Sequence, residues 1–325
     1  MKDKILQLLV RNGGTCLSGQ EISDLLGISR TAVWKHIKTL QEQGYPIESI
    51  NRKGYLIKEG ESLILSGDLK ERLYTERLGK NILVLPRIDS TNQHARNIKE
   101  QLLDGDIIIA EEQTKGKGRR GKSWSSPRGE GIWITIYLEP TFSVEKAAFI
   151  TQLAAAAMWH SIKKNTSIEA EIKWPNDLLV NGRKMCGILT ELAGEINQIE
   201  FMLVGVGLNV NTDSFPEDIN NIATSLKIVS GKSVNRSDLI IDFIQQFEFY
   251  YDELIQNDSS ENALRIIRQN SSVIGRSINI LKAGKQIQAK GINILDNGNL
   301  EVEYPDKSRE VLSGGEVSVR NRDDE

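Results

Sequence analysis

The first part of the chain places its apolar residues at the spacing of short amphipathic helices. Apolar positions within residues 5–9 form a helical stripe that ends before a pair of glycines. Ser18 is followed three residues later by Glu21, and this capping-box pattern predicts the start of a second short helix. Gly27 predicts a tight turn, and a third helix is predicted over residues 30–43. Helix, glycine turn and helix in this order are typical of a helix-turn-helix.

The third predicted helix separates an apolar face from a cationic one. Val33, Ile37 and Leu40 recur at intervals of four and three residues, so they predict the buried face. After this helix, two short β-like runs flank residues 51–54 and predict a hairpin with a cationic tip, or wing. A recognition helix and a wing place cations and hydrogen-bond donors against DNA. The predicted DNA contacts are Arg30, Thr31, Trp34, Lys35, Lys38, Arg52 and Lys53.

The uneven distribution of charge agrees with DNA binding at this end. The chain has a net charge of −3, but residues 1–58 contain nine basic and five acidic side chains, so they carry +4 and the remainder −7. A basic module on an acidic body indicates that nucleic-acid binding is confined to the N-terminal part. The alternative is a helical protein-interaction module whose charges are only a solvated face. DNA binding is favoured because capping, turn, outward charges and wing agree.

Beyond residue 62 the pattern changes to strands that alternate with longer helices. Strands are predicted over residues 81–86, 106–111, 131–139, 172–180, 184–191 and 200–211. Helices are predicted over residues 66–78, 91–103, 144–164, 236–256 and 262–269. Gly205 and Gly207 inside a strand indicate that a ligand or another backbone approaches closely. This mixture predicts a central α/β domain.

The last fifty residues have the pattern of a small all-β module. Strand-like runs begin at Ser277, and turn residues at 296–299 and 305–306 separate some of them. Five short strands in about fifty residues are typical of a small barrel. The chain is therefore predicted to contain three domains, residues 1–62, 63–270 and 271–325.

The glycine–cation loop, residues 113–124, is the most distinctive segment of the central part. Three glycines alternate there with five cations, in the sequence Q-T-K-G-K-G-R-R-G-K-S-W. Glycine lets backbone N–H groups approach a ligand closely, and Lys and Arg side chains bring positive charge. The loop is therefore predicted to wrap an anionic ligand and to become ordered when the ligand binds. The alternative is a solvated surface loop, which the hydrophobic strands on both sides disfavour.

Part of this loop satisfies the P-loop pattern, in which a phosphate-binding loop follows a strand and opens a helix. The required spacing is met by Gly116, Gly121, Lys122 and Ser123. The segment after Ser123 contains a proline and two glycines before a strand-like run begins, so it does not suit the helix that the motif requires. A P-loop is therefore disfavoured.

A second chemical signal comes from a predicted hairpin. Asn181-Gly182 is the strongest short signal for a two-residue turn, so the strands at 172–180 and 184–191 are predicted to pair antiparallel. This pairing brings Asp177 within a few residue pairs of Lys184. Apolar neighbours could direct Lys184 into a dry site, where a cation has a stronger effect. The alternative is an ordinary lysine at the end of a strand.

Composition limits the class of protein. At 325 residues the chain is long enough for two or three domains, and 39% apolar and 26% charged residues are ordinary for a globular protein. No apolar run reaches the length of a membrane span, and the first residues do not resemble a signal peptide. Cys16 and Cys186 are far apart in sequence, so a disulfide is not expected. These features predict a cytoplasmic protein without a membrane partner.

Taken together, the motifs resemble those of a known family. They are D-S-T-N-Q at 89–93, G-K-G-R-R-G-K-S-W at 116–124, K-W-P-N-D at 173–177, R-K-M-C-G-I-L at 183–189 and G-V-G-L-N-V at 205–210. Over essentially its whole length the chain resembles the bifunctional biotin–protein ligases and biotin operon repressors of bacteria, in the Bacillus-type order. The resemblance implies an α+β multidomain fold: an N-terminal winged helix-turn-helix, a central mixed α/β catalytic domain of the biotin and lipoate ligase type, and a small C-terminal SH3-like β-barrel.

The resemblance also implies an activity and its partners. Members of this family use ATP and Mg²⁺ to convert biotin to biotinyl-5′-AMP. They then transfer biotin to a lysine of a biotin carboxyl carrier protein or domain, as in acetyl-CoA carboxylase or pyruvate carboxylase. The adenylate-bound form is a homodimer that binds operator DNA and represses the biotin operon. The chain is thus expected to be a cytoplasmic ligase and repressor, with biotin and ATP as substrates and no fixed metal site of its own.

Matching the family's motifs residue by residue implies the roles of individual side chains. The implied biotin contacts are Ser90, Thr91, Asn92, Gln113, Lys117, Gly118, Arg119 and Lys184. The implied ATP or adenylate contacts are Gly116, Arg120 and Asn209, and the implied catalytic residues are Lys184, Arg119 and Asp177. Lys117 and Lys122 stand where many members carry arginine, so charge remains but bidentate geometry is lost. We therefore expect Arg119 to be the chief phosphate contact.

Two other functions are left open by the residues alone. One is a ligand-sensing repressor without ligase activity, which would bind biotin but form no AMP. The other is a lipoate-type ligase on the same scaffold, and competition between the two acids would distinguish it. The K-W-P-N-D motif beside the basic loop favours biotin. A P-loop regulator is a distant third.

Overall fold

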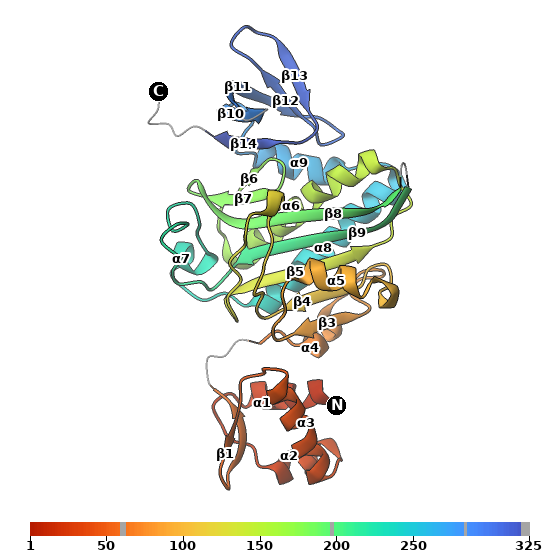
Figure 1. Ribbon diagram of the computed structural model, residues 1–325, viewed down its shortest axis with the longest axis vertical. Helices are drawn as coiled ribbons and strands as arrows, with labels where there is room; N and C mark the ends of the chain where they lie inside the picture. The colour runs from red at the N-terminus through yellow and green to blue at the C-terminus, as the bar shows by residue number, and fades with distance from the viewer. Residues whose placement is uncertain (59–62, 196–197, 283–284, 320–325) are drawn as a thin grey trace.

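The protein is described here by a computed structural model, which covers residues 1–58, 63–195, 198–282 and 285–319. Three parts follow one another along the longest axis: a small helical part at the N-terminus, a central sheet with its helices, and a small β-module (Figure 1). The predicted boundary at residue 62 lies outside the described residues. The division into three domains stays a prediction.

The N-terminal part contains the elements that the apolar spacing predicts. They are α1 (Lys2–Arg11), α2 (Gly19–Leu26), α3 (Arg30–Glu42), β1 (Ile47–Ile50) and β2 (Gly54–Ile57), with the two strands antiparallel. The capping box is present: the backbone N–H of Glu21 donates to the Ser18 hydroxyl, and the N–H of Ser18 donates to the Glu21 carboxylate. Gly27 ends α2 with a φ of 64°, in the left-handed region that favours glycine. The predicted helix-turn-helix and hairpin are therefore confirmed.

In the described residues, the central sheet has seven strands. They are β3 (Ile82–Leu85), β4 (Ile107–Ala110), β5 (Gly131–Leu138), β6 (Glu171–Lys173), β7 (Asp177–Val180), β8 (Arg183–Glu195) and β9 (Gln198–Asn209). The order is β3-β4-β5-β9-β8-β7-β6, in which β3 and β4 are parallel and the other neighbouring pairs are antiparallel. Every residue of β5 is buried, which explains its nearly continuous apolar sequence.

Helices cover both faces of this sheet. On one face α6 (Val144–Thr166) packs against α8 (Arg236–Asn257), and on the other lies α5 (Thr91–Asn97) (Figure 1). The four alanines at 154–157 in α6 are fully buried, so their small side chains allow the helix to pack closely. The shorter helices of this part are α4 (Ser66–Arg72), α7 (Leu226–Ser230) and α9 (Glu261–Gln269).

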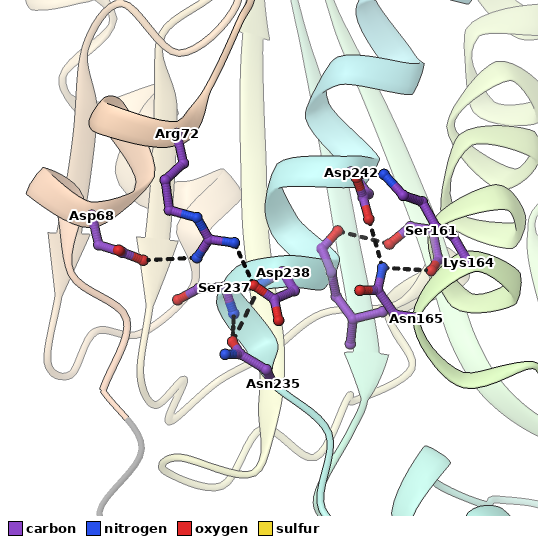
Figure 2. Close-up of polar contacts among 10 residues, drawn as sticks. Asp68, Arg72, Ser161, Lys164, Asn165, Asn235, Ser237, Asp238 and Asp242 are labelled. Atoms are coloured by element: carbon purple, nitrogen blue, oxygen red, sulfur yellow. Dashed lines mark hydrogen bonds and ion pairs between the residues drawn. The ribbon is translucent and has the colours of Figure 1, made fainter.

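Polar contacts hold α8 between two neighbouring helices (Figure 2). On one side, Arg72 of α4 forms an ion pair with Asp238 of α8. On the other side, Asp242 of α8 pairs with Lys164 of α6 at 2.6 Å. The side chain of Asn235 caps α8 by accepting hydrogen bonds from two backbone N–H groups. The first turns of α8 are thereby fixed relative to the sheet.

Two predicted helices are shorter than the apolar pattern suggested. The prediction over residues 66–78 is wrong beyond Arg72, where α4 ends. The backbone N–H groups of residues 76–78 instead donate to the carboxylate of Glu248 on α8. These donors are satisfied by a distant side chain, so the segment needs no helix. The helix predicted over residues 91–103 ends with α5 and is followed by a 3₁₀ turn.

The strand predicted over residues 172–180 is wrong in its middle. The chain reverses there, because β6 and β7 pair antiparallel with Lys173 opposite Asp177. The reversal is made by residues 174–176. The indole of Trp174 is buried there and donates a hydrogen bond to the carbonyl of Gly298 in the C-terminal part. The predicted pairing of the second half with the next strand is confirmed, since β7 pairs antiparallel with β8.

The C-terminal module is a five-stranded antiparallel sheet in the described residues. Its strands are β10 (Ser277–Lys282), β11 (Lys285–Ile294), β12 (Leu300–Glu303), β13 (Arg309–Leu312) and β14 (Glu316–Val319), in the order β13-β12-β11-β10-β14. Its buried side chains, such as Ile278 and Val302, belong to the same hydrophobic cluster as the central sheet. The N-terminal part has a separate cluster. The predicted fold class, helix-turn-helix followed by a mixed α/β body and a β-module, is confirmed.

Candidate functional site

One pocket lies where α5, the glycine–cation loop and the strands β8 and β9 meet. It is lined by all eight residues predicted to contact biotin: Ser90, Thr91, Asn92, Gln113, Lys117, Gly118, Arg119 and Lys184. The structure thus brings together residues that are far apart in sequence. Their individual roles as ligand contacts stay predictions.

A buried polar network supports the end of the pocket formed by α5. The side-chain carbonyl of Gln113 accepts hydrogen bonds from the backbone N–H and the hydroxyl of Thr91, at 2.8 and 3.1 Å. The hydroxyl of Thr135, fully buried on β5, lies 2.8 Å from the Thr91 hydroxyl and 2.6 Å from the side-chain oxygen of Asn92. Asn92 in turn donates to Glu191 at 2.8 Å. The network holds the neutral side chains of Thr91 and Asn92 at fixed positions.

Sequence reasoning missed two members of this network. Thr135 and Glu191 lie in predicted strands with no motif to mark them. The polarity of Thr135 among apolar neighbours was the available signal, because a buried hydroxyl requires a partner; Glu191 is half-buried and gave no such signal. Ser90 is the N-cap residue of α5, but its side chain makes no capping hydrogen bond.

The predicted proximity of Asp177 and Lys184 is confirmed. The ammonium nitrogen of Lys184 lies 2.7 Å from a carboxylate oxygen of Asp177. An irregularity between Leu178 and Leu179 shifts the register, so that Asp177 lies opposite Gly187 rather than closer to the turn. The Lys184 side chain is 34% exposed and that of Asp177 is 15% exposed. Lys184 is therefore at the rim of the pocket, partly open to water.

Trp124, at the end of the glycine–cation loop, forms one wall of the pocket. The ammonium of Lys184 lies 5.2 Å from the centre of its ring, within the range of a cation–π contact. A Cβ atom at Gly207 would lie 2.6 Å from the indole nitrogen, and one at Gly205 would lie 2.4 Å from the side-chain oxygen of Asn92. The glycines on β9 therefore allow close approach, but the groups that approach are the side chains of Asn92 and Trp124 rather than the predicted ligand or backbone.

The glycine–cation loop is fastened to the turn between β6 and β7. The guanidinium of Arg119 donates to the side-chain oxygen of Asn176 at 2.8 Å. The amide nitrogen of Asn176 donates to Asp177 at 2.9 Å and to the carbonyl of Ile188 at 3.1 Å. Asn176 therefore links Arg119 to the pair of Asp177 and Lys184. Asn176 is part of the K-W-P-N-D motif, but the motif alone predicted no role for it.

The three residues predicted to contact ATP or the adenylate do not line this pocket. Asn209 is buried, and its amide donates to the carbonyl of Thr224 at 3.1 Å, so it anchors the loop that follows β9. A Cβ atom at Gly116 would lie 2.4 Å from the carbonyl oxygen of Trp124, so Gly116 allows the loop to fold on itself. Arg120 has a φ of 55° at the loop tip. Contact of these three with the nucleotide stays a prediction. No helix follows Ser123, as expected for a loop that is not a P-loop.

The predicted DNA-binding residues lie on the surface of the N-terminal part. The five on α3 are exposed, and Trp34 has half its surface open to solvent, with the ammonium of Lys38 5.4 Å from its ring. Arg52 and Lys53 form the exposed tip of the β1–β2 hairpin. The opposite face of α3 is buried through Val33, among others, as predicted. The arrangement agrees with a recognition helix and wing, and the individual DNA contacts stay predictions.

Among the residues that the structure describes, no group of three or more His, Cys, Asp or Glu side chains is arranged to hold a metal ion. Both cysteines are free, and burial raises the pKa of the Cys186 thiol far above its usual range. Cys186 is therefore a packed thiol rather than a nucleophile. None of the described helices combines the length and the apolar character needed to cross a membrane.

Two known protein families match the chain, one in its central part and one in its N-terminal part. The biotin/lipoate A/B protein ligase family matches residues 84–209, and a helix-turn-helix domain family matches residues 2–56. The bifunctional ligase/repressor BirA of Bacillus spizizenii is 32% identical over 317 residues, which cover 96% of this chain and 97% of that protein. BirA of Escherichia coli is 29% identical over 98% of this chain and 97% of its own length.

Similarity to solved structures covers about three quarters of the chain. A biotin protein ligase from Aquifex aeolicus, solved in complex with biotin and ATP, superimposes with a TM-score of 0.65 and is 25% identical. The match covers 74% of this chain and 99% of that chain.

Proposed function

The chain belongs to the family of bifunctional biotin ligases and repressors, and on this premise we propose that it joins biotin to a lysine of a carrier protein and represses transcription by binding operator DNA. The observation that carries the proposal is the pocket, which combines a neutral hydrogen-bonding end with a cationic end at Arg119 and Lys184. A ligand with a polar ring and a carboxylate fits this combination.

The polar end of the pocket favours biotin over lipoate. The ureido ring of biotin has N–H donors and a carbonyl acceptor, and these match the amide of Asn92 and the hydroxyl of Thr91. The dithiolane ring of lipoate has no N–H or carbonyl groups, so it could not add hydrogen bonds to the partners that Thr91 and Asn92 already have in the protein. A site built to hydrogen-bond a ligand discriminates strongly against an analogue that lacks the partner groups.

The cationic end suits the first chemical step. A carboxylate oxygen of biotin attacks the α-phosphorus of ATP, the bond to the bridging oxygen breaks, and pyrophosphate leaves. The step brings two anions together, so preorganised cations reduce the repulsion and stabilise the charge that builds in the transition state. We assign this role to Lys184 and Arg119, and the glycine–cation loop would exclude water from the hydrolysable anhydride.

The second step transfers biotin to the carrier. The amine of the carrier lysine attacks the carbonyl carbon of the adenylate, an amide bond forms, and AMP leaves. Asp177 lies at the rim beside Lys184, where its carboxylate would orient the incoming amine and accept its proton. The carrier is a biotin carboxyl carrier protein or domain, such as that of acetyl-CoA carboxylase or pyruvate carboxylase.

Magnesium is proposed to enter with ATP. The donor set of the site suits this, because Asp177 is already paired with Lys184 and the described residues offer no cluster of carboxylates. Mg²⁺ commonly takes most of its ligands from phosphate oxygens and water. When bound, it would neutralise the charge of the leaving pyrophosphate, while the protein residues bind and orient biotin and the α-phosphate.

Repression is proposed to require a homodimer bound to the adenylate. Ligand-dependent ordering of the glycine–cation loop would change the surface around the pocket and so couple ligand binding to assembly. A symmetric dimer presents two recognition helices to two half-sites of an inverted repeat. ATP, carrier proteins and DNA are all available in the cytoplasm, where we place the protein.

The direct test is biotin-dependent exchange of labelled pyrophosphate into ATP, with lipoate as the competing acid. Exchange with biotin alone supports the proposed ligase. Binding of biotin without exchange would contradict the ligase function and leave a ligand-sensing repressor. Exchange with lipoate but not biotin would instead identify a lipoate-type ligase.

Replacing Arg119 with alanine should weaken retention of the adenylate. The substitution removes both a cation from the pocket and the hydrogen bond to Asn176 that fastens the loop. We expect release of biotinyl-5′-AMP about 10- to 150-fold faster, because one charge-assisted hydrogen bond contributes about 1.5–3 kcal/mol. The release rate is measured by chasing labelled adenylate. Arg265→Ala, at an exposed position on α9, is the control; an equal rate in both variants would contradict the role of Arg119.

Replacing Lys53 with alanine should weaken DNA binding by removing a phosphate contact of the wing. We expect affinity to fall similarly for operator and unrelated DNA, and the slope of log affinity against log salt to decrease by about 1. Titrations at several salt concentrations, with an operator selected from a random pool, measure this. Lys4→Ala makes the same charge change on α1, at an exposed position away from the wing. Loss of affinity confined to the operator would instead assign Lys53 to base recognition.

A further inference from the structure

The C-terminal module is attached to the residues that lead directly into the turn between β6 and β7, residues 174–176, which we call the catalytic turn. Arg276 forms an ion pair with Glu171 at the start of β6. Ile172 exchanges two backbone hydrogen bonds with the segment before β10: its N–H donates to the carbonyl of Asn270 at 2.7 Å, and its carbonyl accepts from Ser272 at 3.0 Å. These contacts hold β6 along its length. Asn176, which is hydrogen-bonded to Arg119 and Asp177, follows three residues after the end of β6 at Lys173.

The third attachment is made by one backbone carbonyl. The carbonyl oxygen of Gly298, in the turn between β11 and β12, accepts a hydrogen bond from the indole N–H of Trp174 at 2.9 Å. It accepts a second one from the amide of Gln152 on α6 at 2.6 Å. Trp174 and Gln152 are almost completely buried. Two buried donors on one acceptor define the position of the indole, because neither has water as a substitute.

The position of Gly298 is itself fixed. Its φ is +80°, in the left-handed region, and a Cβ atom would lie 2.3 Å from the ring of Phe149 and 2.7 Å from the amide nitrogen of Gln152. Glycine is therefore required both by the backbone conformation and by the lack of space. The turn is inserted tightly between α6 and the indole, so movement of the module would move Trp174.

Trp174 is two residues from Asn176. Asn176 contacts two of the three proposed catalytic residues, Arg119 and Asp177. Asn176 accepts a hydrogen bond from Arg119 and donates one to Asp177, and Asp177 pairs with Lys184. Trp174 does not line the pocket, and its indole N–H donates to the carbonyl of Gly298 rather than to any of these groups. Its influence on the reaction is therefore indirect, through the backbone of residues 174–176.

We propose that the C-terminal β-module is a positioning element for the active site. The Gly298 carbonyl holds Trp174, and through it the turn that places Asn176 and Asp177 against Arg119 and Lys184. The proposal rests on the proposed ligase function, and it assigns Trp174, Gln152 and Gly298 as positioning residues. Displacement of reacting groups by about 1 Å can reduce a rate by about 100-fold, so loss of one such bond is enough to be measured.

The test uses the full chain with Trp174→Phe, which keeps a large buried ring and removes the indole N–H. We expect kcat for biotin-dependent pyrophosphate exchange to fall by about tenfold, with the KM for biotin within twofold of wild type, because the polar end of the pocket lies on other elements. Transfer to the carrier should fall as well, since Asp177 directly follows this turn as the first residue of β7. Thermal unfolding, monitored alongside, keeps the comparison to folded protein.

The matched control is Trp159→Phe. The indole N–H of Trp159, on α6, donates to the carbonyl of Ala170 at 2.7 Å, so this variant loses the same kind of bond without touching the catalytic turn. Its kcat should stay within twofold of wild type. Gln152→Met is the second variant, and it removes the other donor to the Gly298 carbonyl. Its kcat should fall two- to fivefold. This variant tests the positioning role if Trp174→Phe does not fold.

The outcomes separate the two proposals. If the wild-type chain shows no biotin-dependent exchange, the ligase function fails before the variants are compared. If the wild type is active and Trp174→Phe and Gln152→Met keep a wild-type kcat, the positioning role is overturned. A fall in kcat equal to that of Trp159→Phe would also overturn it, because the loss would then follow from any indole bond in this region.

Discussion

In the Lys184→Ala variant, biotin-dependent pyrophosphate exchange is expected to fall by about 100- to 1,000-fold while the protein stays folded. Removal of one preorganised donor to a developing anion typically costs this much in kcat. Lys184 is the cation that lies both in the pocket and beside Asp177, and its ammonium also contacts the ring of Trp124. The loss would also leave the 15%-exposed Asp177 carboxylate without this counter-charge, which adds repulsion to an incoming phosphate.

Exchange rates at saturating ATP and biotin, together with thermal unfolding, measure this effect. Lys184→Arg keeps the charge but changes its shape, and should recover part of the rate. The matched control is Lys164→Ala, which removes a lysine of a 2.6 Å ion pair with Asp242 outside the pocket. Exchange in Lys184→Ala comparable to that control would remove Lys184 from the catalytic step.

The second large effect is expected on stability, in the Arg236→Met variant. The carboxylate of Glu111 is fully buried and lies 2.8 Å from the guanidinium of Arg236, whose side chain is 1% exposed. Removing one partner of a buried ion pair leaves the other charge buried without its counter-ion. We expect the free energy of unfolding to decrease by about 3–5 kcal/mol.

Chemical denaturation of the purified protein measures this change. The control is Arg309→Met, which breaks a pair with Glu301 at 3.3 Å in which the Arg309 side chain is 54% exposed; its effect should be below about 1 kcal/mol. A change for Arg236→Met as small as that of the control would show that water or rearrangement compensates the buried carboxylate. Methionine is chosen because it fills part of the volume of arginine without a charge.

The buried pair also lies at the junction between the N-terminal part and the catalytic body. Glu111 accepts a hydrogen bond from the backbone N–H of Ile64 at 2.6 Å, and Arg236 donates to the carbonyl of Gly131 at 3.0 Å. Nearby, Arg128 donates to the carbonyl of Gly44, next to the end of α3, at 2.6 Å. Arg128 follows the glycine–cation loop in the chain, so the segment after that loop contacts the end of the predicted recognition helix.

Local sequence patterns predicted the elements whose cause is local. The capping box at Ser18 and Glu21 satisfies backbone donors within one turn, so its geometry depends on neighbouring residues alone. Asn181 and Gly182 adopt φ values of 50° and 75°, as a two-residue hairpin turn requires. Once that turn is set, the pairing that brings Asp177 near Lys184 follows from counting along two strands.

The errors have a non-local cause. Nothing within residues 66–78 shows that the helix must end at Arg72, because the group that satisfies the following N–H donors is the carboxylate of Glu248, about 170 positions later. The reversal at 174–176 was likewise missed. The indole of Trp174 in this turn donates to the carbonyl of Gly298, which belongs to a different part of the chain.

The site shows the same division. Motifs identified the charged and polar residues that face the pocket, since charge and glycine content are visible in the sequence. The groups behind them were not identified: Thr135 has no motif, and Asn176 gains its importance only because Arg119 and Asp177 lie on either side of it. A hydrogen-bonding partner depends on tertiary position, which periodicity does not record.

For this protein, the sequence by itself determined the helix-turn-helix, the alternation of strands and helices, the position of the glycine–cation loop and, through resemblance, the family. These follow from interactions between residues close in the chain or from composition. The tertiary structure decided where elements end, which polar side chains are joined to Lys184, and that the C-terminal module contacts the turn at residues 174–176. Those features depend on contacts between residues such as Trp174 and Gly298, which come together only when the packed core forms.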